Sequence, residues 1–139
     1  HNIGLADKTY IFVTPVPDYD NEENIGAFSL DSEVRNHDDY LCKTTSFRQT
    51  MEIEMLDSYT FDDVRLIKID VEGMELEVLK GAVLTIQAHD YPPIMFEAWT
   101  HKEWFQPKRQ ELISFLESLG YEIHNMGEDN VAIHKGEVK

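Results

Sequence analysis

Hydrophobic and polar positions change their spacing several times along the chain, and each change predicts a different element. Residues 64–71 form an apolar run that only a few polar side chains interrupt, Lys68 among them. Neighbouring apolar positions point to both faces of a strand, so this run predicts a strand of a parallel sheet that is covered on both sides. From Met74 to Ile86 the apolar residues recur at steps of three and four. That spacing predicts an amphipathic helix of about four turns.

The C-terminal third continues the alternation of strands and helices. Residues 94–96 (IMF) predict a short buried strand that ends at Glu97. Pro107 suits the first position of a second helix, and Gly120 suits its C-terminal cap. Residues 121–124 and 131–134 flank a polar turn and predict an antiparallel pair of strands.

The N-terminal part has a weaker pattern. Residues 10–13 (YIFV) predict a short strand that Pro15 and Pro17 stop. Residues 18–43 are polar and without periodicity, so we expect a long excursion that contains a strand near residues 28–30. Met51, Ile53 and Met55 alternate with glutamates, which predicts a half-exposed strand.

This order of elements predicts a single α/β domain over residues 1–139, with a mostly parallel sheet that closes in an antiparallel hairpin. Open sheets of this kind bind ligands beyond the carboxyl ends of their strands. Asp70 and Glu97 follow two strands that we expect to be neighbours. Both carboxylates are therefore candidates for a functional site at that edge.

The acids near residue 70 also have a purely structural interpretation. Asp70 suits the N-cap of the following helix, and an N-cap aspartate is common. Glu72 and Glu75 would lie in the first helical turn, where a carboxylate stabilises the helix dipole by about 0.3–1 kcal/mol. Gly73 in that turn would cost about 1 kcal/mol relative to alanine, which indicates a bend or a close approach of another group.

Charge and cysteine content narrow the partners and the compartment. The 139 residues carry a net charge of −15, which disfavours nucleic acid and anionic membrane surfaces as partners. The single cysteine, Cys42, allows no internal disulfide. No apolar run approaches the roughly 20 residues that span a bilayer, and no leader pattern is present. We therefore expect a cytoplasmic protein.

Residues 66–75 (LIKIDVEGME) and 78–82 (VLKGA) together resemble the central motif of the FkbM family of methyltransferases. Weaker motifs of the family follow its order along the rest of the chain, at residues 2–7, 24–29, 56–57, 93–97, 119–121 and 130–132. The resemblance implies a Rossmann-like class I methyltransferase sheet and the cofactor S-adenosylmethionine. It also implies O-methylation of sugars or other small-molecule hydroxyl groups.

The resemblance implies further roles for individual residues. Asp7 resembles a position near the adenine of the cofactor, and Asn24 and Gly26 shape the edge of the substrate or cofactor site. Asp70, Glu72, Glu97 and His101 are the catalytic candidates. Asp70 and Glu97 would either hold a divalent cation such as Mg²⁺ or supply the base that removes the hydroxyl proton.

One family feature is missing from the sequence. The chain has seven glycines but no G-x-G turn after an N-terminal buried strand, where the family holds the methionine part of the cofactor. We therefore expect the N-terminal strands of the sheet to lie upstream of residue 1. The strand at residues 64–71 would then have an unpaired edge, through which the chain would self-associate.

Two other classes of protein stay open on the sequence alone. The first is a non-catalytic α/β module that pairs with another chain. The second is a sugar-binding accessory domain that uses Trp99 and Trp104. The structural alternative for both tryptophans is packing over the second helix. Lys68 lies inside a predicted strand, and we expect it to form a structural ion pair with Glu97 or Asp57.

Overall fold

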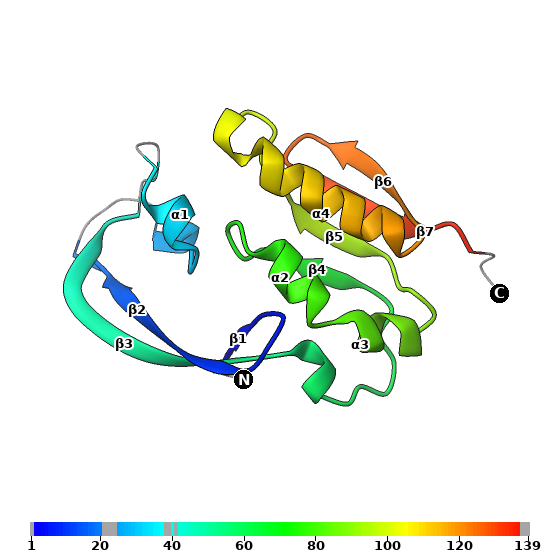
Figure 1. Cartoon of the computed structure of the whole chain (residues 1–139), viewed down its shortest axis with the longest axis horizontal. Coiled ribbons are helices and arrows are strands. Elements are labelled where there is room, and N and C mark those ends of the chain that lie inside the picture. Colours follow the sequence, from blue (N-terminus) through cyan, green and yellow to red (C-terminus); the bar gives the residue numbers. More distant parts are fainter. Residues whose placement is uncertain (1, 21–24, 38–39, 41, 137–139) are drawn as a thin grey trace.

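The computed structural model describes residues 2–20, 25–37, 40 and 42–136, and they form two mixed β-sheets with helices (Figure 1). The first sheet has the strand order β1-β3-β2, and the second has the order β4-β5-β7-β6. The strands of the first sheet are β1 (Gly4–Leu5), β2 (Tyr10–Pro17) and β3 (Thr44–Glu54). Those of the second are β4 (Ile67–Ile69), β5 (Ile94–Glu97), β6 (Tyr121–Met126) and β7 (Asp129–His134).

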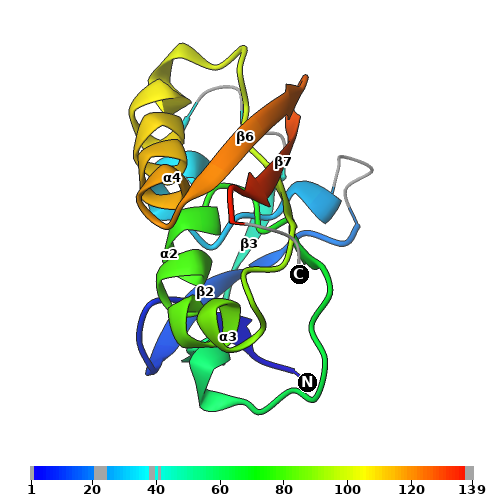
Figure 2. The same ribbon diagram turned by 90° about the vertical axis from the view of Figure 1, so that its right-hand side faces the viewer.

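The helices lie mainly on one side of the second sheet. Figure 2 shows α4, α2 and α3 stacked along that side, to the left of the sheet strands β6 and β7. The α-helices are α1 (Ser32–Arg35), α2 (Glu75–Lys80), α3 (Val83–Ala88) and α4 (Gln106–Ser118). Three short 3₁₀ helices are η1 (Ile25–Ala27), η2 (Leu56–Ser58) and η3 (Glu103–Phe105). Within the described residues no helix has the length and apolar character needed to span a membrane.

The predicted α/β class and the C-terminal hairpin are confirmed, but the prediction of a mostly parallel sheet is wrong for the described residues. In the second sheet only β4 and β5 are parallel, and β7 is antiparallel to both β5 and β6. In the first sheet β1 is parallel and β2 antiparallel to β3. The reason is that β7, the second strand of the hairpin, lies between β5 and β6 and is antiparallel to each of them.

The predicted four-turn helix is two short helices that meet at Gly81 and Ala82. At Gly81 the backbone of Ala6 comes so close that an added Cβ would overlap the Ala6 carbonyl oxygen. The Gly81 carbonyl also accepts a hydrogen bond from the Asp57 amide at 2.9 Å. The chain therefore bends where β1 and η2 pack against it.

Asp57 then starts the second of these helices. Its carboxylate accepts hydrogen bonds from the Leu84 amide at 3.0 Å, the Thr85 amide at 2.8 Å and the Thr85 hydroxyl at 2.8 Å. The two amides belong to the first turn of α3 and otherwise lack partners within the helix. A residue 26 positions earlier than α3 thus supplies its cap, which no local pattern indicates.

Several predicted element boundaries differ from those of the structure. The strand at residues 10–13 continues to Pro17, because β2 is an edge strand where proline removes no sheet hydrogen bond. The strand expected near residues 28–30 is absent among the described residues of that segment, and α1 follows instead with Asp31 as its N-cap. The strand containing Met51 and Ile53 is longer than predicted and begins at Thr44.

The strand expected at residues 64–71 is shorter and is covered on one face only. Leu66 is 53% exposed, and Lys68 is also exposed, whereas Ile69 on the opposite face is buried. The helices cover that opposite face, where they form one core. The core contains Leu79, Ile86, Ile94, Phe96, Leu112, Leu116, Tyr121 and Ala132. Gly120 follows the C-cap of α4 at φ +91°, as expected, whereas α4 begins at Gln106, one residue before the predicted first position at Pro107.

Candidate functional site

The site lies where β4 and β5 end. The register pairs Lys68 with Met95 and Ile69 with Phe96 in parallel, so Asp70 and Glu97 leave the sheet at the same end. This confirms the expectation that their strands are neighbours. Ligands of open α/β sheets bind at such carboxyl ends.

A third carboxylate joins these two. Asp70, Glu72 and Glu97 each place an oxygen within 4.8 Å of the other two, and we call these three residues the acidic rim cluster. Asp70 is exposed, whereas Glu72 and Glu97 are half-buried. The sequence placed Glu72 in a helix, and only the fold shows that it turns back towards Asp70 and Glu97.

Burial and neighbouring negative charges raise the pKa of Glu72 and of Glu97. Burial, and then the negative charges of Glu97 and Asp70, raise the pKa of Glu72 to about 7, while Lys102 acts in the opposite direction. Burial also raises the pKa of Glu97, against the hydrogen bond from Trp99. The cluster therefore favours a bound proton or a positive charge.

The turn that carries Glu72 corrects the N-cap interpretation of Asp70. Helix α2 begins only at Glu75 and its N-cap is Met74, so Asp70 caps no helix. Glu72 and Gly73 precede the helix with φ angles of 54° and 101°, in the left-handed region. Gly73 is thus not in the first helical turn, and it also lies against α1, because an added Cβ would be 2.8 Å from Val34 Cγ2.

Glu75 is the residue of this region whose burial the sequence did not indicate. It is the first residue of α2, as expected, but its side chain is buried, with a relative exposure of 2%. Its Oε1 accepts hydrogen bonds from the amides of Val71 at 3.3 Å and Gly73 at 3.1 Å. Burial raises the pKa of Glu75 to about 7, against these hydrogen bonds.

Lys68 pairs differently from the prediction. Its Nζ donates to Asp70 Oδ2 at 3.0 Å, directly after the end of its own strand, rather than to Glu97 or Asp57. Two residues apart on a strand, these side chains lie on the same face. Both are exposed, with side-chain exposures of 63% and 48%, so the pair contributes little to stability and leaves Asp70 accessible.

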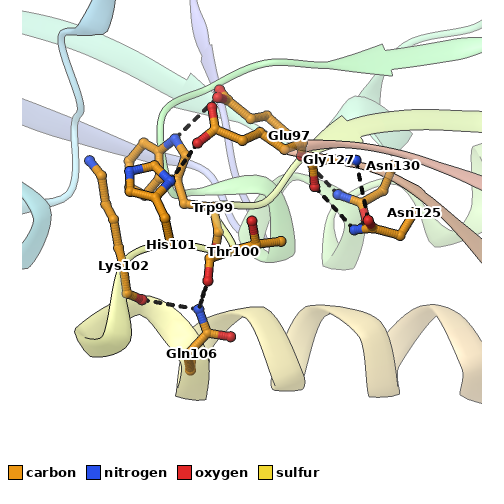
Figure 3. Close-up of polar contacts among 10 residues, drawn as sticks. Glu97, Trp99, Thr100, His101, Lys102, Gln106, Asn125, Gly127 and Asn130 are labelled. Atoms are coloured by element: carbon orange, nitrogen blue, oxygen red, sulfur yellow. Dashed lines mark hydrogen bonds and ion pairs between the residues drawn. The ribbon is translucent and has the colours of Figure 1, made fainter.

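The loop after β5 holds Glu97 in place (Figure 3). Trp99 Nε1 donates to Glu97 Oε1 at 3.1 Å. The Trp99 ring is buried, with its centroid 4.7 Å from that of Phe105, which confirms packing for this tryptophan. Lys102 Nζ lies 3.9 Å from the Trp99 ring centroid. The indole thus joins the cluster to the core.

Helix α4 and the hairpin complete this loop. The Gln106 side-chain amide donates to the carbonyls of Trp99, Thr100 and Lys102 at 3.2, 3.1 and 3.0 Å. His101 is exposed, and its Nδ1 lies 2.5 Å from Glu128 Oε1 in the hairpin turn (Figure 3). His101 is therefore next to the acidic rim cluster in sequence but is paired with a different acid.

The residues that resemble cofactor positions lie elsewhere. Asp7 is exposed and lies beside Gly81, at the end of α2 away from Glu72. Gly26 is exposed in η1, and Asn24 lies outside the described residues. The described residues thus bring three of the catalytic candidates together, and the roles of Asp7 and Gly26 in holding S-adenosylmethionine stay predictions.

Residues 2–123 match the Methyltransferase FkbM domain, and the chain belongs to this family. No curated protein matches the chain.

One solved structure that resembles this fold is the crystal structure of the methyltransferase FkbM from Methylobacillus flagellatus KT. The two share 18% sequence identity with a TM-score of 0.52. The match covers 95% of this chain and 27% of the other, so the chain spans about a quarter of that protein's length.

Proposed function

We propose that the protein is an S-adenosylmethionine-dependent methyltransferase that methylates a hydroxyl group of a sugar or another small molecule. Family membership supports methyl transfer. The observation that carries the proposed site is the clustering of three carboxylates, within 4.8 Å of one another, at the ends of β4 and β5. Because the match covers 27% of the solved relative, the activity of that whole protein is a proposal for this chain.

The chemistry assigned to the acidic rim cluster is the handling of the acceptor hydroxyl. Bound S-adenosylmethionine would supply the methyl group. The hydroxyl must lose its proton as its oxygen attacks, and a carboxylate within hydrogen-bond distance can accept that proton. Asp70 is exposed and Glu97 is oriented by the Trp99 indole, so these two are the proposed partners of the hydroxyl.

The charge of the cluster also bears on the acceptor. Burial and then the negative charges of Glu97 and Asp70 raise the pKa of Glu72, and the same charges would repel a phosphate or carboxylate on the acceptor. A neutral polyol, such as a sugar, offers hydroxyl groups without this repulsion. An uncharged acceptor is therefore the substrate class that we propose.

Two roles of the cluster differ in their dependence on metal. Oxygen ligands suit hard divalent cations such as Mg²⁺, and Asp70, Glu72 and Glu97 would be the ligands. Such a cation would lower the pKa of the hydroxyl, whereas without it one carboxylate acts directly as the base. Turnover that is lost in EDTA and restored by Mg²⁺ supports the first role, and turnover insensitive to EDTA supports the second.

The test of the site uses the full-length protein and transfer of labelled methyl groups to a panel of sugars. We expect Asp70→Asn and Glu97→Gln each to lower kcat by about 10²-fold or more, the usual contribution of a general acid or base. Asp63→Asn is the matched control, because Asp63 is an exposed acid that pairs with Arg65 outside the cluster. Wild-type turnover in both cluster variants would exclude the proposed site.

A pairing module is the second candidate, and the edge position of β4 favours it. Among the described residues β4 pairs only with β5, and Leu66 beside it is exposed. Unpaired strand edges associate with other strands. Under this alternative the full-length protein transfers no methyl group to any acceptor, and association is its activity.

A further inference from the structure

We propose that Glu75 is a positioning residue for the acidic rim cluster: its buried carboxylate fixes the backbone turn that carries Glu72 towards Asp70 and Glu97. The inference rests on the proposed function of the cluster and adds a residue that does not touch the acceptor.

The hydrogen bonds of Glu75 bracket Glu72 on both sides. Glu75 Oε1 accepts from the amide of Val71, which precedes Glu72, and from that of Gly73, which follows it. One oxygen thus ties together the two ends of the turn. Residues that hold a catalytic side chain through its backbone act on geometry rather than on the reacting atoms.

The turn needs this support because its backbone is strained. Glu72 has a φ of 54°, a conformation that side-chain-bearing residues rarely adopt and that persists only where the surroundings enforce it. Gly73 continues the turn at φ +101°, which glycine adopts without cost. Without the Glu75 acceptor the two amides would lose their common partner, and Glu72 would relax to an ordinary backbone conformation away from the other two carboxylates.

The burial of Glu75 makes the anchor rigid. Its relative exposure is 2%, and it begins a helix whose next inward residues, Val78 and Leu79, lie in the core. The side chain therefore has little freedom to release the turn. A solvent-exposed glutamate at the first helical position would serve the helix dipole equally well, so burial is not required for that role.

The test compares two substitutions of Glu75 in the full-length protein. Glu75→Gln keeps an oxygen that can accept both amide hydrogen bonds, whereas Glu75→Leu keeps the bulk and removes the acceptor. We expect Glu75→Gln to retain kcat within about threefold. We expect Glu75→Leu to lower kcat by about 10²-fold, the effect of a displacement of about 1 Å in an active site, with KM for S-adenosylmethionine unchanged.

A control separates positioning from general loss of stability. Asp57→Ala removes the three hydrogen bonds that start α3, far from the cluster in the chain, and should lower the melting temperature without changing kcat per folded molecule. If Glu75→Leu loses no more kcat than Asp57→Ala, the proposal is wrong.

Amide hydrogen exchange at Val71 and Gly73 decides the case in which Glu75→Leu does not fold. Glu75→Gln with protected amides and wild-type kcat supports positioning, as does a parallel loss of protection and kcat. Two outcomes overturn the proposal. Protected amides with a lost kcat would mean that the charge of Glu75 matters and not the geometry that it fixes. Lost protection with wild-type kcat would mean that the turn is irrelevant to catalysis. The proposed function fails separately, if Asp70→Asn and Glu97→Gln keep turnover.

Discussion

Gly81 offers a sharp test of how the N-terminal segment packs against the helices. Its φ of −84° and ψ of 5° suit any residue, so alanine can adopt this backbone conformation without strain. In a helical setting alanine would even be favoured by about 1 kcal/mol. The substitution is unfavourable for a steric reason, because an added Cβ would overlap the Ala6 carbonyl oxygen and lie 2.9 Å from the Ala6 carbonyl carbon.

The magnitude follows from what must move. The overlapping atoms belong to backbone, so the Ala6 segment has to separate from α2 rather than rotate a side chain. Overpacking of this kind costs about 1–3 kcal/mol. The same shift strains two hydrogen bonds of 2.9 Å, from the Ala6 amide to Glu54 and from the Asp57 amide to Gly81, each worth about 1 kcal/mol. We expect Gly81→Ala to lower the free energy of unfolding by about 2–4 kcal/mol.

Gly127 provides the matched control. It has a φ of +98° but nothing within 4 Å of an added Cβ, so Gly127→Ala tests backbone strain without a steric clash. We expect it to cost about 1–2 kcal/mol. Urea unfolding of both variants, followed by circular dichroism, gives the two free energies. A Gly81→Ala variant as stable as wild type would refute the close contact between Ala6 and the α2–α3 bend.

Three further predictions concern pH, association and the core. Because the pKa of Glu75 is raised from 4.5 to about 7, its protonated form stabilises the fold below pH 4.5, and this contribution is lost as pH rises to about 7. This contribution to the unfolding free energy is on the order of 3 kcal/mol, and Glu75→Gln should remove its fall over that range. An unchanged pH profile in the variant would contradict the raised pKa of Glu75. Leu66 is 53% exposed beside the β4 edge, so Leu66→Lys should lower self-association of the 139-residue chain in sedimentation; a wild-type chain that stays monomeric would exclude the edge contact. Tyr121→Phe removes the buried hydrogen bond of 2.8 Å to the Pro92 carbonyl and should cost about 1–3 kcal/mol in urea unfolding, whereas no loss would show that water replaces the hydroxyl.

Much of the fold could be predicted because it depends on local patterns. The C-terminal hairpin, the helix from Pro107 to Gly120 and the strand before Glu97 each follow from apolar spacing bounded by proline, glycine or polar turns. The adjacency of Asp70 and Glu97 was also predictable, because both residues stand at the ends of apolar strand patterns. The motif at residues 66–75 carried the family assignment.

Other features could not be predicted because their causes lie far away in the chain. The break at Gly81 depends on the backbone of Ala6, and the start of α3 depends on the Asp57 carboxylate. The direction of β7 depends on where the hairpin docks beside β5. The apolar pattern of the helices is identical with or without these contacts, so periodicity alone predicted one continuous helix.

For the acidic rim cluster, too, some features were predictable from the sequence and others were not. The sequence by itself determined that carboxylates stand at residues 70, 72, 75 and 97 and that two of them end neighbouring strands. Only the tertiary structure decided that Glu72 turns towards Asp70 and Glu97 while Glu75 is buried beneath the turn. The physical reason is that a left-handed backbone at Glu72 and Gly73 reverses the direction of the chain, and such a conformation is held by contacts that the order of the residues does not show.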